Sequence, residues 1–251
     1  MNFRVATSWN ELSLSQAQRL SKCMFNYQGA DEKRAFQMLL TLFTPKGTTW
    51  QRIKFAYLLR NVPLSEIIPY LDFMGEVPTI YTFPTINGLK KPNARMGNIS
   101  IKQFSMADKL YYDFTQSKDE KLLRQMVATL YTLDEFDEEK LPEVAKITDK
   151  QKHLWYAVLL SYISCRNYII KSYPKIFPPE MEPDPEAIVP VFRKEKAYTP
   201  FSEIIKVLAF DDPQPLGNYH EAKKTKIYEF MNILTTAMIR QEEYEKNAAR
   251  K

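Results

Sequence analysis

Apolar residues along this chain recur mostly at the three- and four-residue spacing of amphipathic helices. That spacing predicts helices over 14–27, 31–43, 51–74 with a break near Pro63, 149–177, 199–210 and from Ala222 onward. Alternating or β-branched residues predict short strands over 3–7, 77–86 and 189–192. We therefore expect a mainly α fold, a helical bundle with minor short β-strands.

One part of the pattern occurs twice. Leu12, Ser13, Leu14 and Gln16 match residues 87 positions later, and seven residues between Asp31 and Leu42 match residues 88 positions later. The identities include the "DEK" helix start as well as apolar positions, so amphipathicity alone does not explain them. We predict two diverged copies of a strand–helix–turn–helix unit, the alternative being a coincidence between two amphipathic helix pairs.

The repeat and the prolines predict three regions. Residues 1–87 form a first helical repeat module, residues 88–178 a second, and residues 179–251 a proline-rich acidic linker followed by C-terminal helices. The stretch over 149–177 is apolar enough to cross the core. The residues expected to be buried there are Leu154, Ala157, Val158, Ser161, Tyr162, Cys165 and Tyr168.

Composition narrows the function classes. The chain has 251 residues, of which only 6 are glycine and 16 are proline, so glycine-rich nucleotide-binding architectures are disfavoured. Cys23 and Cys165 lie in apolar helical patterns, where thiols usually act as small buried hydrophobes. No run approaches the ~20 apolar residues of a membrane span. The N-terminal sequence is too polar for a signal peptide, so we expect a reducing cytoplasm.

Candidate chemistry is sparse. His153 and His220 are the only histidines and fall in different predicted elements, which gives no metal-ligand spacing. The phosphate-loop, dinucleotide and zinc-protease motifs are absent. The acidic runs "LDEFDEE" and "PPEMEPDPE" are typical of solvated faces. We therefore predict no catalytic, cofactor-binding or metal site and no enzymatic activity.

Two groups of charged residues need an explanation. Lys90, Lys91 and Arg95 lie together in "GLKKPNARMGN", in a chain with a net charge of only +5. They form either a solvated loop between the repeats or a contact for phosphate or an acidic surface. Arg166 lies inside a dense apolar helix. We expect it either to pair with a carboxylate such as Asp108 or to extend to the surface.

Four segments carry a resemblance to a known group of proteins. They are "ATSWNELSLSQAQRL", "NISIKQFSMADKLYYDF…KLLRQMVATLY", "CRNYIIKSYPKIF" and "PFSEIIKVLAF…GN…IYEFMNIL", in that order. Together they resemble poorly characterised helical virion-assembly or structural proteins of tailed bacteriophages and prophages, especially those of Bacteroidetes-type hosts. The resemblance covers most of the chain and supplies no catalytic residues.

The resemblance implies a non-enzymatic morphogenesis protein, either a structural component such as part of the head–tail connector or a tail-assembly chaperone. Its partners would be other phage proteins, with homo-oligomers left open, and it would act in the host cytoplasm during assembly, with retention in the virion left open. The alternative is a DNA-contacting regulatory or packaging protein that uses Lys90, Lys91, Arg95 and the basic residues of the last helix. The last helix carries the predicted partner-binding stripe: Ile227, Phe230, Met231, Leu234 and Met238.

Overall fold

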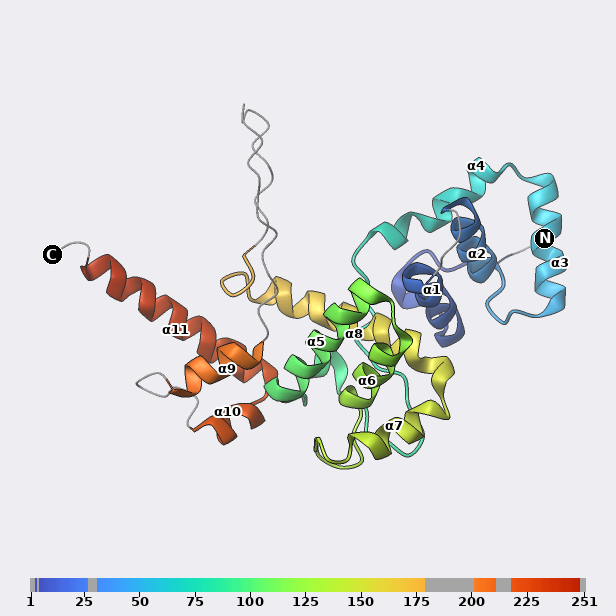
Figure 1. The fold of residues 1–251 in the computed structure, drawn as a ribbon. Coiled ribbons are helices and arrows are strands. Elements are labelled where there is room, and N and C mark those ends of the chain that lie inside the picture. The colour runs from blue at the N-terminus through green and yellow to red at the C-terminus, as the bar shows by residue number, and fades with distance from the viewer. Residues whose placement is uncertain (1–2, 4, 27–30, 179–200, 211–217, 249–251) are drawn as a thin grey trace.

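The computed structural model describes residues 3, 5–26, 31–178, 201–210 and 218–248. These residues form eleven α-helices and four short 3-10 helices (Figure 1), so the expected mainly α class is confirmed. No named strand occurs among them. Two isolated antiparallel bridges, Lys90–Thr132 and Ser100–Lys226, are the β pairings within the described residues.

The strands expected over 3–7 and 77–86 are not present in the described part of the chain, and the third expected strand, over 189–192, lies outside it. The segment over 77–86 has no regular secondary structure, and two of its backbone groups bond to serine side chains. The amide of Ile80 donates to Ser164 Oγ at 3.1 Å, and Ser161 Oγ donates to the carbonyl of Thr82 at 2.8 Å. Pro78 and Pro84 also lack the amide hydrogen that a ladder requires.

The first region contains the helices α1 to α4. They span α1 (Leu14–Asn26), α2 (Asp31–Phe43), α3 (Thr49–Asn61) and α4 (Leu64–Ile67), preceded by η1 (Trp9–Glu11) and followed by η2 (Ile68–Gly75). The predicted break near Pro63 is confirmed, because α3 ends at Asn61 and α4 begins at Leu64. The core of this region contains Leu20, Leu42 and Phe55.

The remaining helices share a second core. They are η3 (Ala94–Met96), α5 (Ile101–Ser117), α6 (Glu120–Leu130), α7 (Leu141–Asp149), η4 (Lys152–Leu154), α8 (Trp155–Ser172), α9 (Phe201–Phe210), α10 (Tyr219–Lys224) and α11 (Ile227–Ala248). Side chains of α9, α10 and α11 belong to the same apolar cluster as those of α5, α6 and α8. The described helices therefore build two apolar clusters, whereas three regions were predicted; the region boundaries stay a prediction.

Helix α8 connects the two cores. It runs through the centre of the molecule behind α5, from the side of α1 towards that of α11 (Figure 1). Its Leu160 belongs to the first core, whereas Val158, Leu159 and Tyr162 belong to the second. Every residue expected to be buried in this helix is buried except Tyr168, which is half-buried. The predicted continuous helix over 149–177 is instead α8 preceded by the short η4.

The two helix pairs α1–α2 and α5–α6 contain equivalent hydrogen bonds. Gln16 Nε2 donates to the carbonyl of Leu42 at 3.0 Å, and Gln103 Nε2 donates to the carbonyl of Leu130 at 3.3 Å. The backbone N–H of each glutamine also donates to the hydroxyl of the serine three residues earlier at 3.3 Å. The two serines therefore cap the starts of α1 and α5 in the same way. The strand expected before each pair is not formed.

Candidate binding surfaces

The stripe predicted on the last helix is part of the core. Ile227, Phe230 and Met231 are fully buried, Leu234 is buried and Met238 is half-buried. The reason is a backbone connection at the start of α11. The amide of Ile227 donates to the carbonyl of Ile99 at 3.0 Å, and that of Ile101 donates to Thr225 at 2.8 Å. These bonds hold α11 against α5, so the stripe does not form an exposed contact surface.

Arg95 does not join Lys90 and Lys91. Its guanidinium lies over the rings of Tyr81 and Tyr168, at 5.2 and 4.5 Å from their centroids. Its backbone adopts a left-handed φ of 56°, and its carbonyl accepts a 2.6 Å hydrogen bond from the hydroxyl of Tyr228. Arg95 therefore links α8 and α11, and it is not part of the lysine pocket described next.

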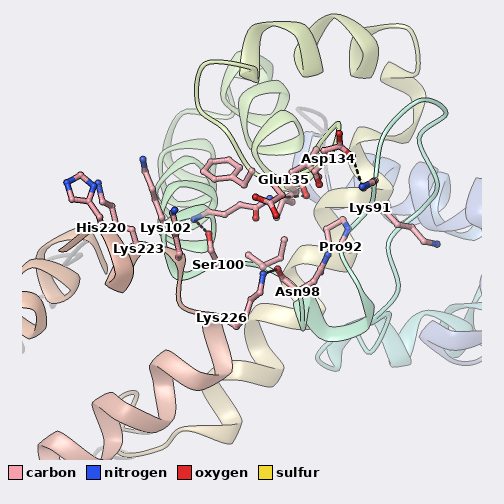
Figure 2. Close-up of a pocket in the computed structure, with 17 residues that line it drawn as sticks. Lys91, Pro92, Asn98, Ser100, Lys102, Asp134, Glu135, His220, Lys223 and Lys226 are labelled. Atoms are coloured by element: carbon pink, nitrogen blue, oxygen red, sulfur yellow. Dashed lines mark hydrogen bonds and ion pairs between the residues drawn. The ribbon is translucent and has the colours of Figure 1, made fainter. Parts of the chain in front are cut away.

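Lys90 and Lys91 line a pocket with a volume of about 530 Å³ (Figure 2). We call it the lysine pocket. It lies between the loop after the segment over 77–86, the start of α5, the loop after α6, and α10. Six lysines and two carboxylates line it, the lysines being Lys90, Lys91, Lys102, Lys223, Lys224 and Lys226.

The two sides of this pocket differ in charge. Asp134 and Glu135 lie on the loop after α6, across the pocket from His220 and Lys223 (Figure 2). Lys90 Nζ bonds to Asp134 at 2.7 Å, which lowers the pKa of that carboxyl below its usual value. Lys102 pairs with Glu138 at 2.7 Å. Lys91 Nζ instead donates to the carbonyl of Phe83 at 3.2 Å, so Lys90 and Lys102 are the lysines on this side that pair with carboxylates among the described residues.

The other side carries Lys223, Lys224 and Lys226, which we call the α10 lysine edge. In the described part of the chain none of the three pairs with a carboxylate. Lys223 Nζ lies 4.1 Å from the centroid of the Tyr219 ring, and Lys226 Nζ donates to the carbonyl of Asn98 at 2.9 Å. Among the described residues this edge therefore holds three positive charges without a carboxylate partner, two at the end of α10 and one two residues beyond it.

The sequence points to Lys90 and Lys91 and, through the basic residues of the last helix, to the α10 lysine edge, whereas Lys102 was not identified. Lys102 and the α10 lysine edge are more than 120 positions apart in the chain. The Ser100–Lys226 bridge brings their segments together, and no local pattern announces such a bridge. The signal available in the sequence was the "KKTK" run, which resembles any solvated helix end.

A second candidate surface lies on α3. Trp50, Ile53 and Tyr57 are 63%, 55% and 58% exposed, although each is a large apolar or aromatic side chain. Their spacing of three and four residues places them on one face of the helix. We call this the α3 face. The opposite side of α3 packs inward through Phe55, whose ring contacts that of Phe43 at a centroid distance of 5.3 Å.

Basic residues flank the α3 face. Lys54 Nζ lies 5.4 Å from the centroid of the Trp50 ring, and Arg60 is exposed one turn beyond Tyr57. No Asp or Glu occurs between Thr49 and Asn61. The sequence pattern predicts a helix here but not its exposed face, because an apolar residue on the outer side of a helix has the same spacing as one in the core.

Histidine, cysteine and carboxylate side chains are the usual protein ligands of a metal ion. Within the described residues, no three of them are placed to hold a metal ion. Cys165 is buried, and desolvation raises the pKa of its thiol to about 12, while Cys23 is half-buried; both are free thiols. Arg166 Nε pairs with Asp108 at 2.6 Å, which confirms the expected ion pair.

None of the described helices combines the length and apolar character that crossing a membrane would require. No protein-family model matches the chain, and searches of curated proteins and of solved structures found no match either.

Proposed function

We propose that this chain is a non-enzymatic morphogenesis protein of the tailed-phage type, a structural component or a tail-assembly chaperone, and that it binds another protein through the α3 face. The observation that carries the proposal is the exposure of Trp50, Ile53 and Tyr57 together on one helix. Contiguous apolar surface of this kind marks protein contact sites. The resemblance to virion-assembly proteins supports the class of partner, which the α3 face alone does not specify.

The composition of the α3 face is that of an interface core. Tryptophan and tyrosine bury 150–250 Å² each when covered and are the residues that most often dominate binding energy. Lys54 and Arg60 lie at its margins, where interfaces are polar. The matching surface is therefore an apolar patch rimmed by carboxylates, and we propose that chemistry for the partner.

The finer architecture is also a proposal. We infer that the α1–α2 and α5–α6 pairs are diverged copies of one helix–turn–helix unit. The equivalent glutamine-to-carbonyl bonds and serine caps support this, because they join residues that the sequence repeat also matches. In this view the copies have separate tasks. The first packs against α3, which carries the α3 face, and the second packs with α8 to α11 around the larger core.

The proposal places the protein in the host cytoplasm while particles are assembled. Its test is co-purification of the tagged chain from cells that are producing the phage particles. The variant combines Trp50→Ser, Ile53→Ser and Tyr57→Ser. Its matched control combines Leu14→Ser, Val77→Ser and Val207→Ser, which remove side chains of comparable exposure elsewhere.

We expect virion or assembly proteins to co-purify with the wild type and the control but not with the α3 variant. Loss of binding should amount to about 2 kcal/mol or more for the central aromatic residues. The melting temperatures of all three proteins should be similar, because the changed side chains are exposed. Equal recovery of partners by the α3 variant would refute the proposal. If the wild type recovers a second, untagged copy of this chain instead, the α3 face is a self-association surface and the proposed partner class is wrong.

A further inference from the structure

We propose that the lysine pocket is a binding site for the phosphate backbone of a nucleic acid, and that the α10 lysine edge makes the decisive contacts. This site is separate from the α3 face, on the other core cluster, and does not depend on the function proposed above. It gives the chain a second kind of partner.

The lysines of the pocket come together from separate parts of the chain. The six lysines come from a loop at 90–91, from α5 and from α10 and its end, segments that are far apart in the sequence. Backbone pairing fixes two of these segments in place, because the Lys90–Thr132 and Ser100–Lys226 bridges are both at the pocket. The fold therefore brings Lys90 and Lys102 to the short run that carries Lys223, Lys224 and Lys226.

Positive charge without a carboxylate partner is concentrated on the α10 side of the pocket among the described residues. Lys90 and Lys102 have carboxylate partners, whereas Lys223, Lys224 and Lys226 have none among the described residues. Like charges on neighbouring residues repel one another, and a bound anion would relieve that repulsion. Asp134 and Glu135 repel a phosphate from the opposite side of the pocket (Figure 2), so the favourable path for an anion runs along α10.

The chemistry of the lysines and the size of the pocket indicate which kind of anion it binds. Lysines are strongly hydrated point charges on flexible stems, which suits phosphate contact without base recognition. A cavity of about 530 Å³ that opens to solvent, lined by six lysines, exceeds what one phosphate ion can engage. A chain of phosphodiesters presents successive charges along the edge. We therefore expect sequence-independent binding that weakens steeply with salt.

The experiment measures fluorescence anisotropy of a short labelled DNA duplex of mixed sequence during titration with the full chain at several salt concentrations. The test variant combines Lys223→Gln, Lys224→Gln and Lys226→Gln. The control combines Lys33→Gln, Lys121→Gln and Lys171→Gln, which remove the same charge from exposed positions outside the pocket. The single variant Lys224→Glu is included in case the triple variant folds poorly.

We expect the wild type and the control to bind, and the test variant to bind about tenfold or more weakly. The slope of log affinity against log salt should shrink by about one for each phosphate-contacting lysine removed. Lys224→Glu should also weaken binding while its melting temperature stays that of the wild type. The proposal fails if the wild type does not bind the duplex at low salt, or if test and control variants bind equally well.

Two competitors decide the source of the phosphate chemistry. Tripolyphosphate and poly-glutamate are added at charge concentrations equal to that of unlabelled duplex. If tripolyphosphate and poly-glutamate both displace the labelled duplex less effectively than unlabelled duplex does, the result supports a nucleic acid as the ligand. Displacement by tripolyphosphate as effective as that by the duplex would overturn the assignment in favour of a free polyphosphate. Equal displacement by poly-glutamate would overturn it in favour of an acidic protein surface. The α3 triple variant should bind the duplex like the wild type, so failure here leaves the protein-contact proposal untouched.

Discussion

At the scale of single residues, the two helix pairs use one position in opposite ways. Ser21 in α1 and Asp108 in α5 are 87 positions apart, the offset of the first part of the proposed repeat. Both are buried. Asp108 accepts hydrogen bonds from Tyr162 and Arg166 at 3.0 and 2.6 Å, whereas the hydroxyl of Ser21 has no hydrogen-bond partner among the described residues. The carboxylate of Asp108 is therefore a paired buried charge, whereas burial of the Ser21 hydroxyl costs desolvation free energy.

The buried Ser21 hydroxyl predicts how Ser21→Ala changes the free energy of unfolding. A buried donor without a partner costs about 1–3 kcal/mol of desolvation free energy, and alanine removes it without changing the rest of the side chain. The variant should be as stable as the wild type or more stable in urea denaturation. A loss of more than about 1 kcal/mol would show that this hydroxyl has a partner in solution.

The ion pair makes the opposite prediction for Asp108→Ala. The side chain of Asp108 is 2% exposed and that of Arg166 is 26% exposed, so removing the carboxylate leaves a largely buried guanidinium unpaired. We expect a loss of about 3–5 kcal/mol in the free energy of unfolding. Asp113→Ala on the same helix is the control, because its pair with Lys109 lies at the surface and should contribute less than about 1 kcal/mol. Equal losses for the two variants would contradict the role of burial.

At the scale of elements, the helices were largely predictable and the strands were not. Apolar periodicity located α1, α2 and α8 because each buries one face or most of its surface. It could not show that the segment over 77–86 would satisfy its backbone through Ser161 and Ser164 of α8, since those contacts are about 80 positions away in the chain.

The central position of α8 predicts a large effect of truncation there. Leu159 is fully buried in the second core, so Leu159→Ala should cost about 2–5 kcal/mol through lost contacts and a cavity. Val207→Ala in α9 should change stability by less than about 0.5 kcal/mol, because Val207 is exposed. Thermal or urea unfolding of the two variants gives both values. A loss below 1 kcal/mol for Leu159→Ala would mean that α8 is not the shared core helix.

The contact between α6 and α7 predicts a dependence on pH. Arg124 makes two 2.7 Å bonds to the carboxylate of Asp149, and these bonds lower the pKa of Asp149 in the folded protein. A carboxyl with a depressed folded-state pKa stabilises the fold above its unfolded pKa of about 3.9 and loses this effect as pH falls through the folded value. The pair is partly exposed, so its contribution is less than about 1 kcal/mol.

Asp149→Asn should therefore be slightly less stable than the wild type at pH 7, and the difference should vanish in strong acid. Urea denaturation across pH 2.5 to 7 measures it, the range being set by the reference pKa of about 3.9. A difference that grows as the pH falls would mean that another group, and not this pair, is responsible.

At the scale of the whole molecule, each core cluster carries one candidate binding surface. The α3 face belongs to the first cluster, and the lysine pocket to the second, at the junction of α5 and α10 (Figures 1 and 2). The sequence pointed to Lys90 and Lys91 but assigned partner binding to the last helix, whose stripe the fold buries. Periodicity shows that a helix has an apolar face; which faces remain uncovered is decided by tertiary packing.

The central claim is that the α3 face contacts another protein during particle assembly, and site-specific photo-crosslinking tests it most directly. A photoreactive phenylalanine analogue replaces Ile53 in one version of the chain and Val207 in another, two positions that are each 55% exposed. Both versions are irradiated in cells producing the particles. The account predicts a discrete crosslinked product with a virion or assembly protein from position 53 and none from position 207. Crosslinking from neither position, or equally from both, would contradict it.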